Sequence, residues 1–287
     1  MRSLPVGEVE IAFLDEGPRD GRPVVAVHGF PDGPWTFDHL AAALVDAGFR
    51  VIRPWLRGHG PSTAPPRRVA PLPDLVDDVE GLATALDLDR PALVGHDWGA
   101  VIGWVSASRP DPPWSAVAAL AIPPLPVQAR AALDPVQALH RSGYMWWMQV
   151  PGVERLLPRI ADRLYARWSP GWDPPEGHMA RVRDLLAHPA TARAAVAPYR
   201  WILPAVLTGR YPADRRAVPA IPVRYLHGAD DTCFPASAAE RARRVLPTGS
   251  VEVVHGAGHF LHLERPEVVT PILLDFLGDS RRWTAQS

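Results

Sequence analysis

The sequence lacks several features that would each identify a class of protein. No stretch approaches the roughly 18 apolar residues of a membrane-spanning helix, and the segment Met1-Arg2-Ser3-Leu4-Pro5 has no apolar core typical of a signal peptide. The single cysteine, Cys233, excludes a disulfide within this sequence, and no His, Cys or carboxylate cluster surrounds it at the spacing of metal ligands. We therefore expect a cytoplasmic protein with no membrane span and no metal.

The chain also has little net charge. It contains no lysine, and its 30 basic residues nearly balance 31 acidic residues, which gives a formal net charge of -1 and an isoelectric point of about 6.8. Nothing in this balance favours nucleic acid or an anionic membrane as a partner. The composition instead predicts a small, neutral molecule as the partner, and it leaves a homodimer open.

Short apolar runs alternate with longer amphipathic stretches along most of the 287 residues. The apolar runs predict buried strands at residues 24–27, 50–53, 92–94, 116–122, 223–226 and 251–254. The amphipathic stretches predict helices at residues 37–47, 72–86, 100–108, 236–245 and 266–277. This alternation predicts an α/β fold, with a mostly parallel sheet covered by helices on both faces and residues 9–14 as an antiparallel edge strand.

The alternation stops between roughly Pro123 and Val218, where helical patterns follow one another with frequent proline and no convincing strand. An insertion at this point of an α/β chain is most simply a helical lid over the strand ends. We therefore predict residues 1–123 as the first part of the core, 124–218 as the lid and 219–287 as the second part of the core.

The five residues Gly95-His96-Asp97-Trp98-Gly99 follow a predicted strand and precede a predicted helix. A strand that turns this sharply into a helix presents the side chain at its apex, and the flanking glycines relieve the crowding. In the G-x-S-x-G form of this turn, a serine stands at the apex and needs a histidine to remove its proton. An aspartate is already ionised at neutral pH, so Asp97 is predicted to attack a saturated carbon and to form an ester with the substrate.

An ester on Asp97 must then be hydrolysed, which requires a base to activate water and a carboxylate to orient that base. Two later strand ends carry such residues, in Gly228-Ala229-Asp230-Asp231 and Gly256-Ala257-Gly258-His259. Nucleophile, acid and histidine then follow the chain order of the α/β-hydrolase fold. Spacing from the first glycine favours Asp231 over Asp230, and the glycine-flanked His259 is favoured over His255 and His262.

The segment His28-Gly29-Phe30-Pro31 closes the first central strand of the predicted sheet. In this fold, the backbone N–H after such a His-Gly pair joins the N–H of the residue after the nucleophile to form an oxyanion hole. The amides of Phe30 and Trp98 are therefore predicted to hold the oxygen of Asp97 that does not attack, and later the tetrahedral intermediate of ester hydrolysis. The alternative for this segment is an ordinary glycine turn.

Together with Arg57-Gly58-His59-Gly60-Pro61-Ser62, these motifs make the chain similar to the epoxide hydrolases of the α/β-hydrolase fold, and the resemblance covers nearly the whole core. The resemblance implies an enzyme that converts a small-molecule epoxide and water to a vicinal diol without metal or organic cofactor. It also implies two lid tyrosines that donate to the ring oxygen, because an alkoxide is a very poor leaving group unless an acid assists it.

Two lid segments resemble those that carry the tyrosines of the family. Tyr144 begins a segment that runs into Gln149-Val150-Pro151-Gly152, and Tyr199 is followed by Arg200. We therefore expect Tyr144 and Tyr199 to be the donors to the ring oxygen. The other tyrosines lack comparable context and are expected to be packing residues: Tyr165, Tyr211 and Tyr225.

The aromatic residues favour a lipophilic epoxide, with Phe30, Trp98 and Trp147 as predicted substrate contacts. The same core serves haloalkane dehalogenases, so a hydrolytic haloalkane or haloacid dehalogenase with Asp97 as nucleophile is the alternative activity. Dehalogenases for haloalkanes usually have Asn or Glu in place of Phe30, and those for haloacetates have Arg in place of Trp98, so neither pattern fits completely. A non-catalytic ligand-binding protein is the third alternative, although it has no need for nucleophile, acid and histidine together.

Overall fold

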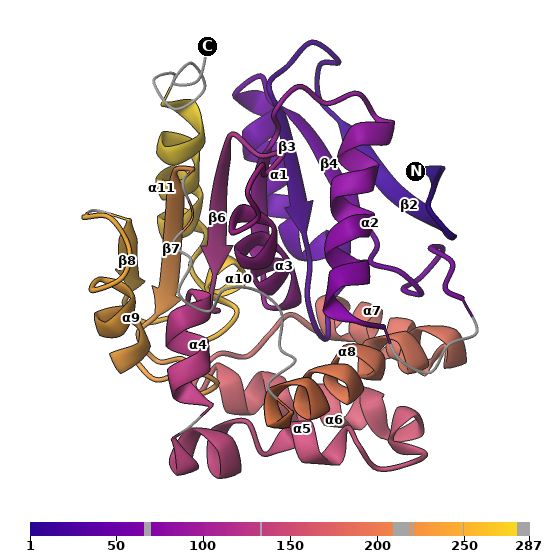
Figure 1. Cartoon of the computed structure of the whole chain (residues 1–287), viewed down its shortest axis with the longest axis vertical. Coiled ribbons are helices and arrows are strands. Elements are labelled where there is room, and N and C mark those ends of the chain that lie inside the picture. Colours follow the sequence, from indigo (N-terminus) through magenta and orange to yellow (C-terminus); the bar gives the residue numbers. More distant parts are fainter. Residues whose placement is uncertain (66–69, 133, 209–218, 220, 249, 280–287) are drawn as a thin grey trace.

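One mixed sheet organises the chain, with the strand order β1-β2-β4-β3-β5-β6-β7-β8 (Figure 1). The computed structural model describes residues 1–279 apart from 66–69, 133, 209–218, 220 and 249. The strands are β1 (Arg2–Val6), β2 (Val9–Glu16), β3 (Pro23–Val27), β4 (Arg50–Pro54), β5 (Ala92–His96), β6 (Ala116–Leu120), β7 (Val223–Gly228) and β8 (Val251–Val254). Neighbours from β4 to β8 run parallel, which confirms the predicted mostly parallel sheet.

The prediction that residues 9–14 form an edge strand is wrong in its position. The strand is antiparallel as expected, but β1 pairs with its free side and becomes the edge of the sheet. Gly7, with φ at 55°, makes the tight turn that returns the chain from β1 to β2. Most side chains of β1 are exposed, so its sequence gives no apolar run that would have predicted a strand.

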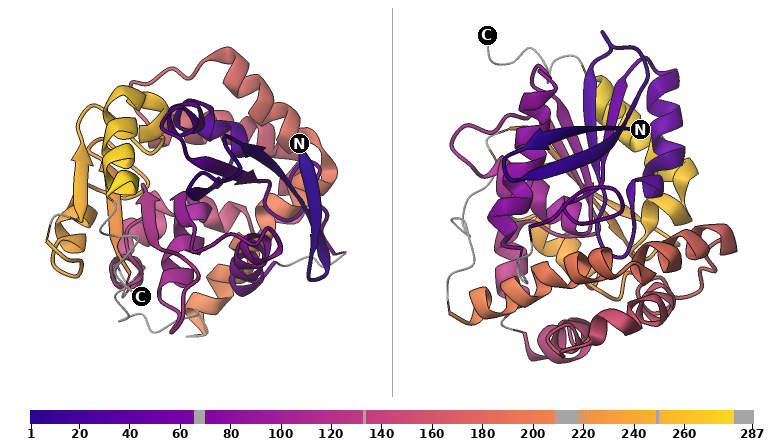
Figure 2. Two further views of the ribbon diagram at one scale, coloured as in Figure 1. Left: turned by 90° about the horizontal axis from the view of Figure 1, so that it is seen from above. Right: turned by 90° about the vertical axis from the view of Figure 1, so that its right-hand side faces the viewer.

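Alternate residues of the strands face two separate core layers, as the period of a strand requires. Val25 and Val27 pack in the layer of α2 (Leu72–Ala85) and α3 (Trp98–Ala107). Val24 and Ala26 pack in the layer of α1 (Asp38–Asp46) and α11 (Pro266–Gly278). The predicted helices on both faces of the sheet are therefore confirmed, and the views from above and from the side show both layers (Figure 2).

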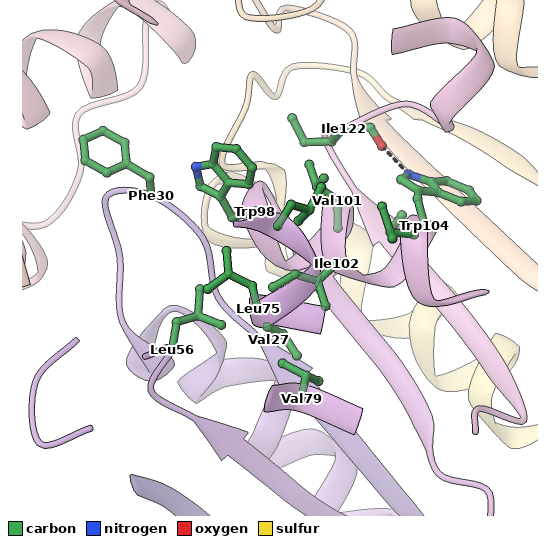
Figure 3. Close-up of a cluster of buried hydrophobic side chains, with 14 of the residues drawn as sticks. Val27, Phe30, Leu56, Leu75, Val79, Trp98, Val101, Ile102, Trp104 and Ile122 are labelled. Carbon is green, nitrogen blue, oxygen red and sulfur yellow. Dashed lines mark hydrogen bonds between the residues drawn. The ribbon is translucent and has the colours of Figure 1, made fainter. Parts of the chain in front are cut away.

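The layer of α2 and α3 supports the turn between β5 and α3. Figure 3 shows Phe30 and Trp98 at one end of this cluster, with Val101 and Ile102 following on α3. The cluster also buries the indole of Trp104, whose Nε1 donates to the carbonyl of Ile122 at 2.9 Å. A fully packed layer leaves the turn little freedom to move.

Between β6 and β7, the described residues form helices and turns but no strand, in agreement with the predicted helical pattern. The helices are α4 (Leu125–Ala131), α5 (Tyr144–Trp147), α6 (Leu157–Trp168), α7 (Glu176–Ala187) and α8 (Pro189–Leu207), with a π-helical turn at Gln137–Arg141 and a 3-10 turn at Val153–Leu156. Helices α5 to α8 gather at one end of the sheet (Figures 1 and 2). The predicted boundary at Val218 lies outside the described residues.

Several helices of the fold have a proline in their first turn, and these prolines account for part of the high proline content. In α2, α4, α6, α8 and α11 a proline stands in the first turn, where its missing N–H leaves no intrahelical bond unmade. Two short helices complete the core, α9 (Ser237–Ala242) and α10 (Leu261–Glu264). In the part of the chain that the structure describes, no helix combines the length and the apolar character needed to cross a membrane.

Candidate active site

The turn between β5 and α3 holds Asp97 in a strained backbone conformation. Its φ is 51° and its ψ is -115°, a region that costs a non-glycine residue about 1–3 kcal/mol. The glycines on either side leave no room for a side chain: a Cβ on Gly95 would lie 2.2 Å from the Gly99 carbonyl oxygen, and a Cβ on Gly99 would lie 1.9 Å from that of Val27. The turn therefore fixes the direction of the Asp97 side chain.

The two oxygens of the Asp97 carboxylate have different surroundings. Oδ1 accepts the backbone N–H of Phe30 at 2.7 Å. A Cβ on Gly29 would lie 2.5 Å from this oxygen and 2.5 Å from the backbone nitrogen of Trp98, so only glycine allows the loop after β3 to approach so closely. Oδ2 instead faces the ring of His259, with Nε2 at 3.6 Å.

His259 lies fully buried between two carboxylates. Its Nδ1 donates to Asp231 Oδ2 at 2.9 Å, and Asp231 Oδ1 accepts the backbone N–H groups of Cys233 at 2.6 Å and Phe234 at 3.2 Å. Asp230, by contrast, is exposed. The structure therefore brings Asp97, Asp231 and His259 together, and the hydrogen bond to Asp231 fixes the orientation of the imidazole ring.

The charges around His259 control its protonation. Burial lowers the pKa of the imidazole, but the carboxylates of Asp231 and Asp97 outweigh burial and raise the pKa to about 10. With this pKa, the ring of His259 is protonated at neutral pH. Conversion of Asp97 to an ester would remove one of these charges, so the pKa of His259 would then fall and the ring could lose its proton.

The rings of Tyr144, in α5, and Tyr199, in α8, join the aromatic residues next to the turn at Asp97. The Tyr199 ring packs edge to face against Phe30, Trp98 and Tyr144, with ring centroids 5.6, 5.1 and 5.6 Å away. Its hydroxyl is buried and has no hydrogen-bond partner among the described residues. Burial raises the pKa of both phenols, and the charge of Asp97 raises it further, so both remain proton donors.

The structure does not bring Trp147 to this cluster, in contrast to its predicted contact with substrate. Its side chain is 69% exposed, whereas Met148 is fully buried. Spacing does not separate the two residues, because both lie within one helical turn of Tyr144, but their exposure shows that Met148 faces the protein and Trp147 faces solvent. The aromatic pattern of the sequence could not distinguish these two faces.

Trp168, at the end of α6, contacts both His259 and Tyr144, and no sequence motif surrounds it that would have predicted these contacts. Its ring centroid lies 4.9 Å from that of His259 and 5.0 Å from that of Tyr144. Its carbonyl oxygen accepts the backbone N–H of His259 at 3.1 Å. A Cβ on Gly258 would lie 2.6 Å from the same oxygen, which explains why glycine precedes the histidine.

The buried carboxylate of Asp32 joins the loop after β3 to helices α6 and α7. The Tyr165 hydroxyl donates to Asp32 Oδ2 at 2.7 Å, and His178 Nε2 lies 3.0 Å from Asp32 Oδ1. The prediction that Tyr165 only packs is therefore wrong, because its hydroxyl binds a buried carboxylate that the apolar pattern around Tyr165 does not reveal. Asp32 directly follows the motif that ends at Pro31, but no motif surrounds His178.

The other candidate tyrosines and histidines have different surroundings. Tyr225 is buried in the core, where its hydroxyl donates to the Ala121 carbonyl at 3.3 Å, and Tyr211 lies outside the described residues. His255 is exposed just after β8, and the buried His262 has its Nε2 2.7 Å from Thr36 Oγ1, so neither contacts Asp97. Over the described ranges, no three His, Cys, Asp or Glu side chains are arranged to hold a metal ion.

Comparisons with known proteins identify the family of this chain. Residues 22–266 match the family model of the alpha/beta hydrolase fold. The chain is 30% identical to epoxide hydrolase A of Mycobacterium tuberculosis, over 96% of this chain and 96% of that protein. The crystal structure of epoxide hydrolase A from Mycobacterium thermoresistibile superposes with a TM-score of 0.77 at 26% identity, over 97% of this chain and 98% of that one. An inhibitor complex of the Bacillus megaterium epoxide hydrolase superposes with a TM-score of 0.80 at 22% identity, over 97% of this chain and all of that one, a likeness in fold. The chain therefore belongs to the α/β-hydrolase fold family, among the relatives of the bacterial epoxide hydrolases.

Proposed function

We propose that the protein is an epoxide hydrolase that converts an epoxide and water to a vicinal diol through an ester on Asp97. The observation that carries this proposal is the position of the Asp97 carboxylate, which lies 3.6 Å from His259 Nε2 and next to Trp98, against whose ring the buried ring of Tyr199 packs. A carboxylate nucleophile, a base for water and a donor for the leaving oxygen are the groups that this reaction needs. The relationship to epoxide hydrolase A supports the same substrate class.

In the first step, Asp97 Oδ2 attacks a ring carbon, because Oδ1 is held by the Phe30 amide. The carbon–oxygen bond of the ring breaks as the new ester bond forms, and Tyr199, assisted by Tyr144, transfers its proton to the departing oxygen. The departing oxygen keeps the electron pair of the broken bond and takes up this proton, so it becomes a hydroxyl group and no free alkoxide forms. The products of this step are a hydroxyalkyl ester and a phenolate.

In the second step, His259 activates a water molecule against the ester carbonyl. The imidazolium must first lose its proton, and the loss of the Asp97 charge promotes this. The phenolate regains one proton in the same stage, so the number of protons on the enzyme is unchanged. The neutral ring then accepts a proton from water, and Asp231 stabilises the imidazolium. The amides of Phe30 and Trp98 hold the tetrahedral oxyanion, whose collapse releases the diol and restores Asp97.

The segment 124–218 would act as the lid that closes this site from water. Its rings from Tyr144, Trp168 and Tyr199 meet those of Phe30 and His259 around Asp97. Such an aromatic enclosure favours a lipophilic epoxide. It also strengthens the charges of the site by excluding solvent.

Replacement of the base should separate the two steps. His259→Gln is expected to retain alkylation and to lose ester hydrolysis by at least about 100-fold, because glutamine cannot accept the proton of water. Intact-protein mass spectrometry after mixing with an epoxide that the wild type converts should show one added substrate mass on Asp97. The absence of an adduct with such a substrate would contradict the two-step reaction.

The two steps should also differ in their dependence on pH. Between about pH 6 and 9, alkylation should vary little, because the raised pKa values keep the phenols protonated and His259 charged. Hydrolysis should rise with pH, since it needs the deprotonated imidazole of the ester, whose pKa lies below the value of about 10 in the free enzyme. Single-turnover tryptophan fluorescence measures both rates. Hydrolysis that is independent of pH, with alkylation that rises, would contradict this order.

Loss of the phenol hydroxyls should affect epoxides more than halides. Tyr199→Phe and Tyr144→Phe should each slow alkylation by an epoxide by about 100-fold, and the double variant more, in the range typical of general acids. A haloalkane with the same carbon skeleton provides the control, because halide needs no proton to leave. Paired assays of diol and halide release test this. Equal losses for both substrates, or halide release alone in the wild type, would favour a dehalogenase.

A further inference from the structure

The two tyrosine segments hold each other through reciprocal hydrogen bonds. Gln149, five residues after Tyr144, donates from Nε2 to the backbone carbonyl of Tyr199 at 3.0 Å. Arg200, next to Tyr199, donates from Nε to the carbonyl of Met148 at 3.1 Å and from Nη2 to that of Val150 at 3.3 Å. Each segment therefore supplies a side chain that binds the backbone of the other.

Glu154 completes this connection by binding the guanidinium. Arg200 Nη1 lies 2.6 Å from Glu154 Oε1, and each of the two side chains is 20% exposed. The other partners of Arg200 are neutral carbonyls, so Glu154 supplies the negative charge that compensates for its partial burial. The fork of an arginine can make these three contacts at once, whereas a lysine has a single point charge.

The position of the two phenols depends on segments that lie far apart in the sequence. Tyr144 is in α5 and Tyr199 is in α8, yet their ring centroids lie 5.6 Å apart at an interplanar angle of 81°. Two donors can share one oxygen only if both hydroxyls reach it, and a displacement of about 1 Å can cost on the order of 100-fold in rate. A connection between the two backbones is therefore a means of keeping both hydroxyls in place.

We propose that Gln149 and Arg200 are positioning residues that hold the Tyr144 and Tyr199 phenols at the separation needed to act on one substrate oxygen, with Glu154 orienting Arg200. The inference rests on the proposed function. Neither residue touches the reacting atoms. Their effect should therefore fall on alkylation, where the phenols act, and spare ester hydrolysis, where His259 acts.

The test measures alkylation and hydrolysis separately in Arg200→Met and Gln149→Leu, which keep most of the side-chain volume. We expect alkylation by an epoxide to fall by at least about tenfold in each, with hydrolysis within about twofold of the wild type. Arg200→Lys should recover part of the loss, because it restores the charge but not the fork. The matched control is Arg183→Met, which removes another lid arginine that binds two carboxylates, those of Asp162 and Glu176, away from the tyrosines. It should change neither rate.

Coupling to the phenol distinguishes positioning from general support of the fold. In a Tyr199→Phe background, Arg200→Met should slow alkylation by less than about twofold, because only one of the two hydroxyls whose separation it maintains is still present. Equal losses in both backgrounds, or equal losses in alkylation and hydrolysis, would overturn the inference.

If Arg200→Met does not fold, judged by circular dichroism, Gln149→Leu and Arg200→Lys provide the same comparison. A wild type without diol formation would contradict the proposed function, whereas an active wild type with unaffected Arg200 and Gln149 variants would overturn this inference alone.

Discussion

The strained turn at Asp97 is the constraint on which the rest of the site depends. Glycines on both sides of Asp97, and Gly29 in the loop after β3, allow β5, α3 and this loop to lie so close together that no side chain would fit between them. Because the packed layer of α2 and α3 supports the turn, the Asp97 carboxylate is aimed before any substrate arrives. Its Oδ1 is occupied by the Phe30 amide, which leaves Oδ2 as the oxygen that faces His259. The backbone strain is thus linked to which oxygen would attack in the proposed reaction.

Electrostatics connect the two proposed chemical steps. His259 binds a proton between two carboxylates, and the covalent step would remove one of those charges. The base is then released only when there is an ester for it to hydrolyse. Trp168 connects the two groups proposed to act as acid and base, since its carbonyl accepts the His259 amide and its ring contacts those of His259 and Tyr144. The proposed acid and the proposed base are therefore held by one set of contacts.

Much of the fold could be predicted from the sequence, because buried parallel strands and amphipathic helices leave a clear periodicity. The meeting of Asp97, Asp231 and His259 could be predicted as well, since each follows a strand whose end lies at the same edge of the sheet. The strand β1 could not, because its side chains are mostly exposed. Asp32 and Trp168 could not either, because their contacts join segments that only tertiary packing brings together. The position of Trp147 could not be predicted either. Its aromatic side chain suggested a contact with substrate, but the side chain is exposed and lies outside the site.

The central claim is the covalent ester on Asp97, and isotope labelling tests it most directly. In heavy-oxygen water with enzyme in excess over substrate, the diol of the first turnover should carry no label, because its new oxygen comes from the Asp97 carboxylate. The peptide that contains Asp97 should in turn gain one heavy oxygen. A labelled diol from that first turnover, with an unlabelled Asp97 peptide, would show direct attack by water and contradict the account.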